Sequence, residues 1–196
     1  MKPLVLLDCD GILADFVGSV LGFVHQHTGS RPEREAVVSQ NIFESIGDKD
    51  VERAFSDHAV KAGFCEGIEP YPEALVGFPR LAGVADVHIV TSPWPSPTWT
   101  FEREEWLLQH FGIPSNRVHH ESQKFLTRGD YLVDDHPKHI REWLLRRRDH
   151  YLGHALLWDT PHNRREEGFW RVRSWDELLT IITTSWGVRP PTPERA

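Results

Sequence analysis

Two aspartates, Asp8 and Asp10, follow directly after a short apolar run, Leu4–Leu7, near the start of the chain. The run predicts a buried strand, and residues two apart in an extended segment point to the same side. Both carboxylates would then share one small space, just before a turn at Gly11. Two like charges held close together are unfavourable unless a cation or a shared proton offsets them. The pair therefore predicts a Mg²⁺ site, a carboxyl kept protonated for acid–base chemistry, or both. An ordinary acidic turn is the alternative.

Length and composition restrict the class of protein. With 196 residues, 39% hydrophobic and 26% charged, the chain can form one domain with a modest insertion. The net charge of −7 argues against a surface for polymeric nucleic acid, and the one dense basic run, residues 146–148, is expected to close a helix. No apolar segment approaches the roughly 18 residues of a membrane span. Cys9 and Cys65 are expected to be free thiols in a reducing, cytoplasmic compartment, because Cys9 lies between the two aspartates.

The hydrophobic pattern predicts an α/β fold. Candidate strands at residues 4–7, 84–90, 117–119, 131–133 and 155–158 are separated by candidate helices. This alternation is typical of a doubly wound parallel, Rossmann-like sheet, here of about five strands. Residues 16–72 have helix-like patterns and no convincing strand, which predicts a small helical cap inserted after the first strand. The catalytic core would comprise residues 1–15 and 73–187, and residues 188–196, with three prolines, would form a flexible tail.

Polar groups collect at the ends of three predicted strands. They are Asp8 and Asp10 after the first, Thr91 and Ser92 after the second, and Asp134 and Asp135 after the fourth, with Lys124 in the segment before the last pair. The carboxyl ends of parallel strands meet at one edge of the sheet, where ligands bind in such folds. Carboxylates, hydroxyls and a cation at one edge make a coherent phosphate site. Taken singly, each group also has an ordinary explanation as a local turn, a solvated lysine or a helix cap.

The order of these motifs resembles the haloacid dehalogenase superfamily, whose phosphatases carry Asp-x-Asp, Thr or Ser, Lys and an acidic pair in that order. Within the superfamily, the chain is similar to the 5′(3′)-deoxyribonucleotidases. Residues 10–16 and 90–93 are close to that family's first two motifs, and residues 157–163 resemble its fifth-strand segment. The resemblance covers nearly the whole chain apart from the cap, where substrate is selected. His136 stands where the family often has Arg, and Ser122 and Gln123 replace its basic residue shortly before Lys124.

The resemblance implies a catalytic mechanism. Asp8 would be the nucleophile that forms an aspartyl-phosphate, which divides one difficult displacement into two easier ones. Asp10 would protonate the leaving oxygen and later accept a proton from the attacking water. Thr91, Ser92 and Lys124 would hold the phosphoryl oxygens.

The resemblance also implies a Mg²⁺ cofactor. Its ligands would be Asp8, Asp134 and, through the backbone carbonyl, Asp10, because hard oxygen donors suit this ion. Asp135 would support the site from behind these ligands, or through a metal-bound water.

Two aromatic residues are candidates for contact with the leaving group. Phe16 closes the first motif and Trp94 follows the second, and a planar base could stack on them; both are also ordinary core or rim aromatics. The expected substrate is a small phosphomonoester, a nucleoside monophosphate, cleaved by a Mg²⁺-dependent phosphatase. A phosphatase of a small non-nucleotide metabolite is the alternative, and a non-catalytic binding module on the same fold is a third hypothesis. A homodimer is one of the assemblies that the sequence leaves open.

Overall fold

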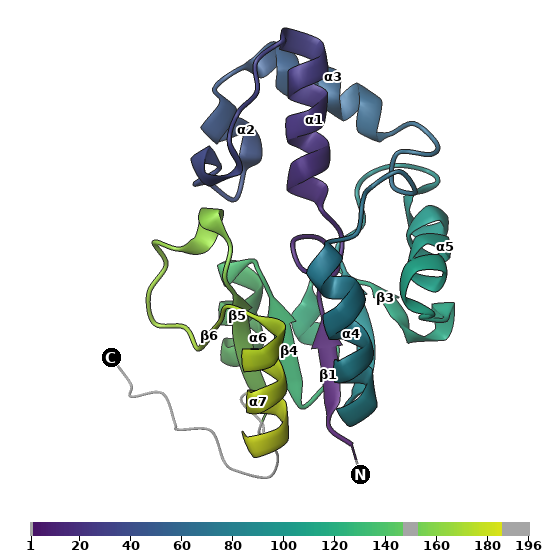
Figure 1. Ribbon diagram of the computed structural model, residues 1–196, viewed down its shortest axis with the longest axis vertical. Coiled ribbons are helices and arrows are strands. Elements are labelled where there is room, and N and C mark those ends of the chain that lie inside the picture. Colours follow the sequence, from purple (N-terminus) through teal and green to yellow (C-terminus); the bar gives the residue numbers. More distant parts are fainter. Residues whose placement is uncertain (1, 147–152, 186–196) are drawn as a thin grey trace.

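The computed structural model describes residues 2–146 and 153–185 (Figure 1). Within them, six parallel strands form one sheet in the order β3-β2-β1-β4-β5-β6. The strands are β1 (Leu4–Leu7), β2 (Asp86–Thr91), β3 (Val118–His120), β4 (Tyr131–Asp134), β5 (His154–Trp158) and β6 (Arg171–Val172). The predicted Rossmann-like α/β fold is confirmed, with six strands where about five were expected. The predicted tail, residues 188–196, lies outside the described residues.

The additional strand is β6, which the hydrophobic pattern missed. It is only two residues long and pairs with the end of β5, so it is too short for any periodicity to reveal it. The start of β2 also differs from the prediction. The preceding helix, α4 (Pro72–Val84), continues to Val84, and the strand begins at Asp86.

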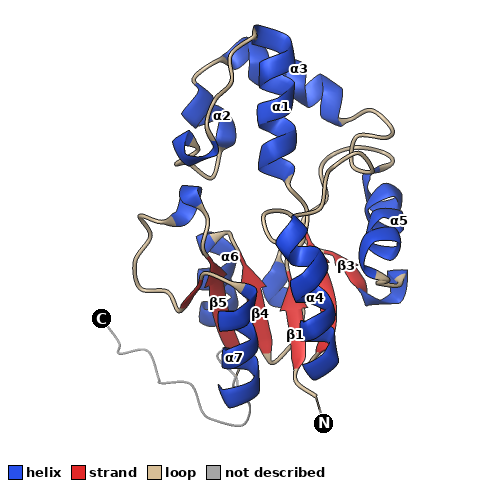
Figure 2. Cartoon of the chain, in the orientation of Figure 1, coloured by secondary structure: helices blue, strands red, loops and turns tan. Residues whose placement is uncertain are grey.

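Helices cover both faces of the sheet (Figure 2). On one face lie α4, α5 (Trp99–Phe111) and α7 (Trp175–Ser185), and on the other lies α6 (Pro137–Arg146). Alternation along β1 explains this arrangement. Val5 and Leu7 belong to a cluster that includes residues of α4, α5 and α7, whereas Leu6 packs with Ile140 and Trp143 of α6. The central strands are therefore buried on both sides, and their carboxyl ends form the accessible edge.

Three helices stand beyond that edge (Figure 1): α1 (Phe16–Thr28), α2 (Ile42–Ile46) and α3 (Lys49–Ala59). They share an apolar cluster of their own, formed by Val20, Val24, Phe43, Val51, Phe55 and Ala59. Short 3₁₀ helices lie between the other elements: η1 (Arg34–Ala36), η2 (Ser115–Arg117), η3 (Lys124–Leu126) and η4 (Pro161–Asn163). The three helices overhang the edge where the candidate ligands gather, and the assignment of residues 16–72 to a cap stays a prediction.

The structure tests some of the expectations from composition and leaves others as predictions. Cys9 and Cys65 are both buried free thiols. In the part of the chain that the structure describes, no helix combines the length and apolar character that crossing a bilayer requires. Helix α6 ends at Arg146, and the other two residues of the basic run fall in the undescribed gap. The cytoplasmic location and the homodimer stay predictions.

Candidate active site

The first, second and fourth strands deliver their terminal residues to one place. Because β1 lies between β2 and β4 in the sheet, the three strand ends are neighbours. Asp8 follows β1, and its backbone N–H donates to Val133 O at 2.9 Å, so the parallel pairing continues through it. Thr91 and Asp134 are the last residues of β2 and β4. The order of the strands therefore brings the three strand-end motifs together at one edge of the sheet.

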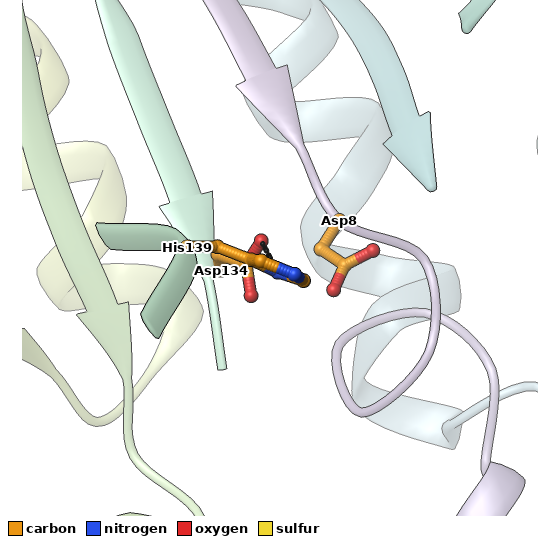
Figure 3. Close-up of side chains that lie close together, drawn as sticks. All are labelled: Asp8, Asp134 and His139. Atoms are coloured by element: carbon orange, nitrogen blue, oxygen red, sulfur yellow. Dashed lines mark hydrogen bonds and ion pairs between the residues drawn. The ribbon is translucent and has the colours of Figure 1, made fainter. Parts of the chain in front are cut away.

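A buried lysine joins the two carboxylates. Lys124 Nζ lies 2.7 Å from Asp8 Oδ1 and 2.7 Å from Asp134 Oδ2, and the lysine side chain is only 1% exposed. His139, from α6, places Nδ1 3.0 Å from the same Asp134 oxygen. Figure 3 shows Asp8, Asp134 and His139 directed toward one another across the strand ends. An ammonium at this position offsets the repulsion that two adjacent carboxylates would otherwise experience.

The two carboxyls differ in acidity. Burial raises the pKa of Asp8 well above its usual value; Lys124 acts against this rise, and the charge of Asp134 adds to it. Burial also acts to raise the pKa of Asp134, but the contacts with Lys124 and His139 outweigh it and hold that pKa below its usual range. Two buried carboxyls and one ammonium leave an excess of negative charge when both acids are ionised. Such a site is suited to a further cation or a proton.

Asp10 has a separate partner. Its Oδ1 accepts a hydrogen bond from Arg103 Nη2 at 2.7 Å, and Arg103 Nη1 lies 3.3 Å from Cys9 Sγ. Arg103 is fully buried on α5, with Trp99 and Trp106 rings 5.1 and 5.2 Å from its guanidinium. Burial raises the pKa of Asp10, and Arg103 acts against that rise. We did not predict Arg103 from the sequence. The available signal was its i, i+4, i+7 spacing with the two tryptophans, which places a charge on an apolar helix face.

The hydroxyls of Thr91 and Ser92 lie at the same strand ends. Both oxygens are buried, and neither has a hydrogen-bond partner among the described residues. Buried polar atoms in native proteins are nearly always paired, so an unpaired buried hydroxyl indicates a missing partner. Both residues line the same cavity as Asp8. These hydroxyls are therefore suited to donate to a ligand that carries oxygen acceptors.

Asp135 lies against the turn of the first motif. A Cβ atom built on Gly11 would meet Asp135 Oδ2 at 2.1 Å, and Gly11 has φ of 83°, so this turn requires glycine on two grounds. The same carboxylate oxygen lies 3.2 Å from His162 Nε2, and the Asp135 carbonyl accepts from Asn163 Nδ2 at 2.8 Å. Asp135 thus connects the ends of β1 and β4 with η4. The supporting role of Asp135 stays a prediction.

A cavity of about 340 Å³ opens over these residues. Asp8, Asp10, Thr91 and Ser92 contribute to its polar lining, while Phe16 and Trp94 are among its apolar lining. The rings of Phe16 and Trp94 lie 5.7 Å apart at an angle of 41°. The volume falls within the range of small-molecule sites. The structure therefore brings the polar and aromatic candidates into one cavity.

The sequence analysis assigned no role to several residues that line the cavity. Trp99, His139 and His162 all contribute to its lining, together with His136, which the sequence had singled out only for its position. Trp99 lies 6.3 Å from Phe16, centroid to centroid. Trp99, His139 and His162 come from α5, α6 and η4, which only the tertiary fold brings to the strand ends.

The donor set fits a divalent cation. Within the described residues, one group of side chains could hold a metal ion: ligand atoms of Asp8, Asp134 and His139 all lie within 4.8 Å of one another. The two buried carboxylates supply the hard oxygen donors that Mg²⁺ prefers. The imidazole of His139 is an additional donor that the motif pattern does not include.

Comparison with known proteins identifies the family. Residues 2–186 match the family model described as "5' nucleotidase, deoxy (Pyrimidine), cytosolic type C protein". A Staphylococcus epidermidis protein provisionally named a 5′(3′)-deoxyribonucleotidase is 26% identical over 182 residues, covering 92% of this chain and 96% of the relative. The 5′(3′)-deoxyribonucleotidase of Bacillus subtilis is 22% identical over 181 residues, covering 91% and 97%.

A solved structure supports the fold independently. A haloacid dehalogenase-like hydrolase from Streptococcus pneumoniae superimposes with a TM-score of 0.57 at 12% identity, covering 91% of this chain and 97% of that one. The predicted resemblance is thus confirmed at the level of family and fold. Because the family model spans nearly the whole sequence, from residue 2 to residue 186, the chain belongs to the 5′ nucleotidase, deoxy (pyrimidine), cytosolic type C family.

Proposed function

We propose that this protein is a Mg²⁺-dependent phosphatase that hydrolyses nucleoside monophosphates, in particular deoxyribonucleotides, through an aspartyl-phosphate. The observation that carries the proposal is a cavity that combines polar groups suited to bind phosphate with aromatic rings. Asp8 and the unpaired hydroxyls of Thr91 and Ser92 belong to its polar lining, and the rings of Phe16 and Trp94 belong to its apolar lining. Family membership and the names of the relatives support the same substrate class.

The first chemical step follows from the contacts of Asp8. Its Oδ1 accepts from Cys9 N and from Lys124 Nζ, each at 2.7 Å, which fixes the carboxylate and leaves Oδ2 to attack phosphorus. The new bond joins Oδ2 to phosphorus as the bond from phosphorus to the ester oxygen breaks. The Asp10 carboxyl donates its proton to that oxygen, so the nucleoside leaves as a neutral alcohol. Burial raises the pKa of Asp10 while Arg103 acts against that rise. Burial also raises the pKa of Asp8, and the ammonium of Lys124 acts against that rise, toward the ionised form that attacks.

The second step returns the enzyme to its starting state. Water attacks the phosphorus of the aspartyl-phosphate, Asp10 accepts its proton, and the bond to Asp8 breaks to release inorganic phosphate. The hydroxyls of Thr91 and Ser92 and the ammonium of Lys124 hold the phosphoryl oxygens in both steps. Mg²⁺, held by Asp8, Asp134 and the Asp10 carbonyl, would supply positive charge to offset the negative charge of the phosphoryl group.

The aromatic lining of the cavity supports a planar leaving group. Phe16 contacts Trp94 and Trp99 with ring centroids 5.7 and 6.3 Å apart, so the apolar wall is continuous. Stacking on such a wall is worth about 1–3 kcal/mol per base where it occurs. A small sugar phosphate would gain little from it, so the nucleotide is the better substrate on this ground.

Phosphate release from a panel of nucleoside monophosphates and sugar phosphates, with Mg²⁺ and with EDTA, tests the proposal. We expect release from nucleotides only when the metal is present, and none from Asp8→Asn, whose thermal melt should remain near that of the wild type. Asp176→Asn is the matched control, because Asp176 is an exposed carboxylate paired with Arg80. A tenfold preference for non-nucleotides would favour the metabolite phosphatase, and an active Asp8→Asn enzyme would exclude the covalent route.

A second variant tests the aromatic wall. Phe16→Ala should reduce the discrimination between nucleotides and sugar phosphates while retaining turnover of a small aryl phosphate. Phe23→Ala is the control, because Phe23 packs with Phe55 and His58 and does not line this cavity. Unchanged discrimination in Phe16→Ala would show that the base is bound elsewhere.

A further inference from the structure

His139 approaches the two carboxylates from a different element. It lies in the first turn of α6, and its Nδ1 is 3.0 Å from Asp134 Oδ2. Its side chain is 14% exposed and lines the active-site cavity. Figure 3 shows the ring directed at the space between Asp8 and Asp134. The phosphoryl-transfer steps above give this imidazole no task.

The separations agree with those between ligands of a single metal ion. Around an octahedral ion with bonds of about 2.1 Å, adjacent ligand atoms lie about 3.0 Å apart and opposite ones about 4.2 Å apart. The distance from His139 Nδ1 to Asp134 Oδ2 is 3.0 Å, and no pair in the group with Asp8 exceeds 4.8 Å. Adjustments of less than about 1 Å would therefore bring all three donors onto one ion.

Asp134 does not need His139 to fix its orientation. Its Oδ1 accepts from the backbone N–H of His136 at 2.8 Å, and its Oδ2 accepts from Lys124 Nζ at 2.7 Å. Each oxygen thus has a partner that orients the carboxylate without the imidazole. A role for His139 as a mere support of Asp134 would duplicate contacts already present.

We propose that His139 binds, through Nδ1, the divalent cation held by Asp8 and Asp134, and that this nitrogen donor raises the affinity of the site for ions such as Ni²⁺ more than its affinity for Mg²⁺. The inference rests on the proposed function, which supplies the cation site. Imidazole nitrogen is a donor that later first-row ions accept more readily than Mg²⁺ does. Coordination through Nδ1 requires the ring proton on Nε2.

Pulsed electron paramagnetic resonance of the protein loaded with Mn²⁺ tests the direct bond. We expect a nitrogen coupling from a bound imidazole in the wild type and its loss in His139→Asn. The matched control is His136→Asn, because His136 lines the same cavity with its ring 4.7 Å from that of His139. Absence of the coupling in the wild type, its survival in His139→Asn, or its loss only in His136→Asn would each overturn the proposal.

Calorimetric titration gives an independent measurement. We expect His139→Asn to raise the Kd for Ni²⁺ by about tenfold or more and the Kd for Mg²⁺ by less than about threefold. Equal changes for the two ions would overturn the claim about ion preference. The outcomes also separate the two proposals: phosphate release by a wild-type enzyme without nitrogen coupling leaves the phosphatase in place, whereas an enzyme that binds neither ion refutes both.

Discussion

Replacement of Lys124 by methionine removes the cation between two buried carboxylates while keeping a side chain of similar length. Lys124 Nζ contacts Asp8 and Asp134 at 2.7 Å each, and all three side chains are at least nine-tenths buried. At an effective dielectric constant of about 20, each contact represents an attraction of about 6 kcal/mol, much of which offsets desolvation. Removing one partner from such a group leaves uncompensated charge, which costs about 3–5 kcal/mol.

This cost is measurable in the absence of metal. In EDTA at pH 7, Lys124→Met should lose about 3–5 kcal/mol of unfolding free energy, equivalent to a decrease in Tm of roughly 6–20 °C for a domain of this size. The double variant Lys124→Met/Asp8→Asn should recover part of the loss, because it removes one of the unpaired charges. Added Mg²⁺ should narrow the gap to the wild type, because the ion supplies the missing positive charge.

Urea denaturation followed by circular dichroism measures these differences, with Lys138→Met as the control for loss of an exposed lysine. A loss below about 1 kcal/mol for Lys124→Met in EDTA, the scale of an exposed ion pair, would refute the buried triad. So would a double variant that is less stable than the single one, because relief of carboxylate repulsion is the basis of the expected recovery.

Three other changes have expected outcomes. Gly11→Ala places a Cβ against Asp135 at a residue with positive φ. It should lower the free energy of unfolding by about 1–3 kcal/mol and lower kcat in a steady-state assay. Wild-type stability and kcat would contradict the close approach of Gly11 and Asp135. Arg103→Met should lower kcat more than it changes KM, because Asp10 loses its partner, and Arg103→Lys should restore part; an equal loss in both variants would contradict this. Burial raises the pKa of Cys65 to about 12, whereas the pKa of an unfolded cysteine is about 8.5. Between these pH values the folded state keeps the thiol proton and the unfolded state loses it. Stability should therefore fall as pH rises above about 9, and native alkylation at pH 9 should be far slower than in urea; equal alkylation rates would contradict the burial.

Patterns within short stretches of the sequence were sufficient to predict the chemical motifs and the fold class. An apolar run followed by Asp8 and Asp10, and hydroxyls or acids after later runs, require only chain-local patterns to be recognised. Alternating strands and helices then limit the sheet to a parallel one, whose carboxyl ends share an edge. The two-residue strand β6 escaped because its pairing with β5 carries no periodic signal.

Partnerships between distant residues were decided by the tertiary structure alone. Arg103 meets Asp10 across 93 positions of sequence, and Lys124 meets Asp8 only after β1 and β4 pair. The sequence carries no signal for His139; only the packing of α6 against the sheet brings its Nδ1 to 3.0 Å from Asp134 Oδ2. Residue type and spacing define which groups can do chemistry, but burial and the absence of competing water decide which of them interact strongly enough to do it.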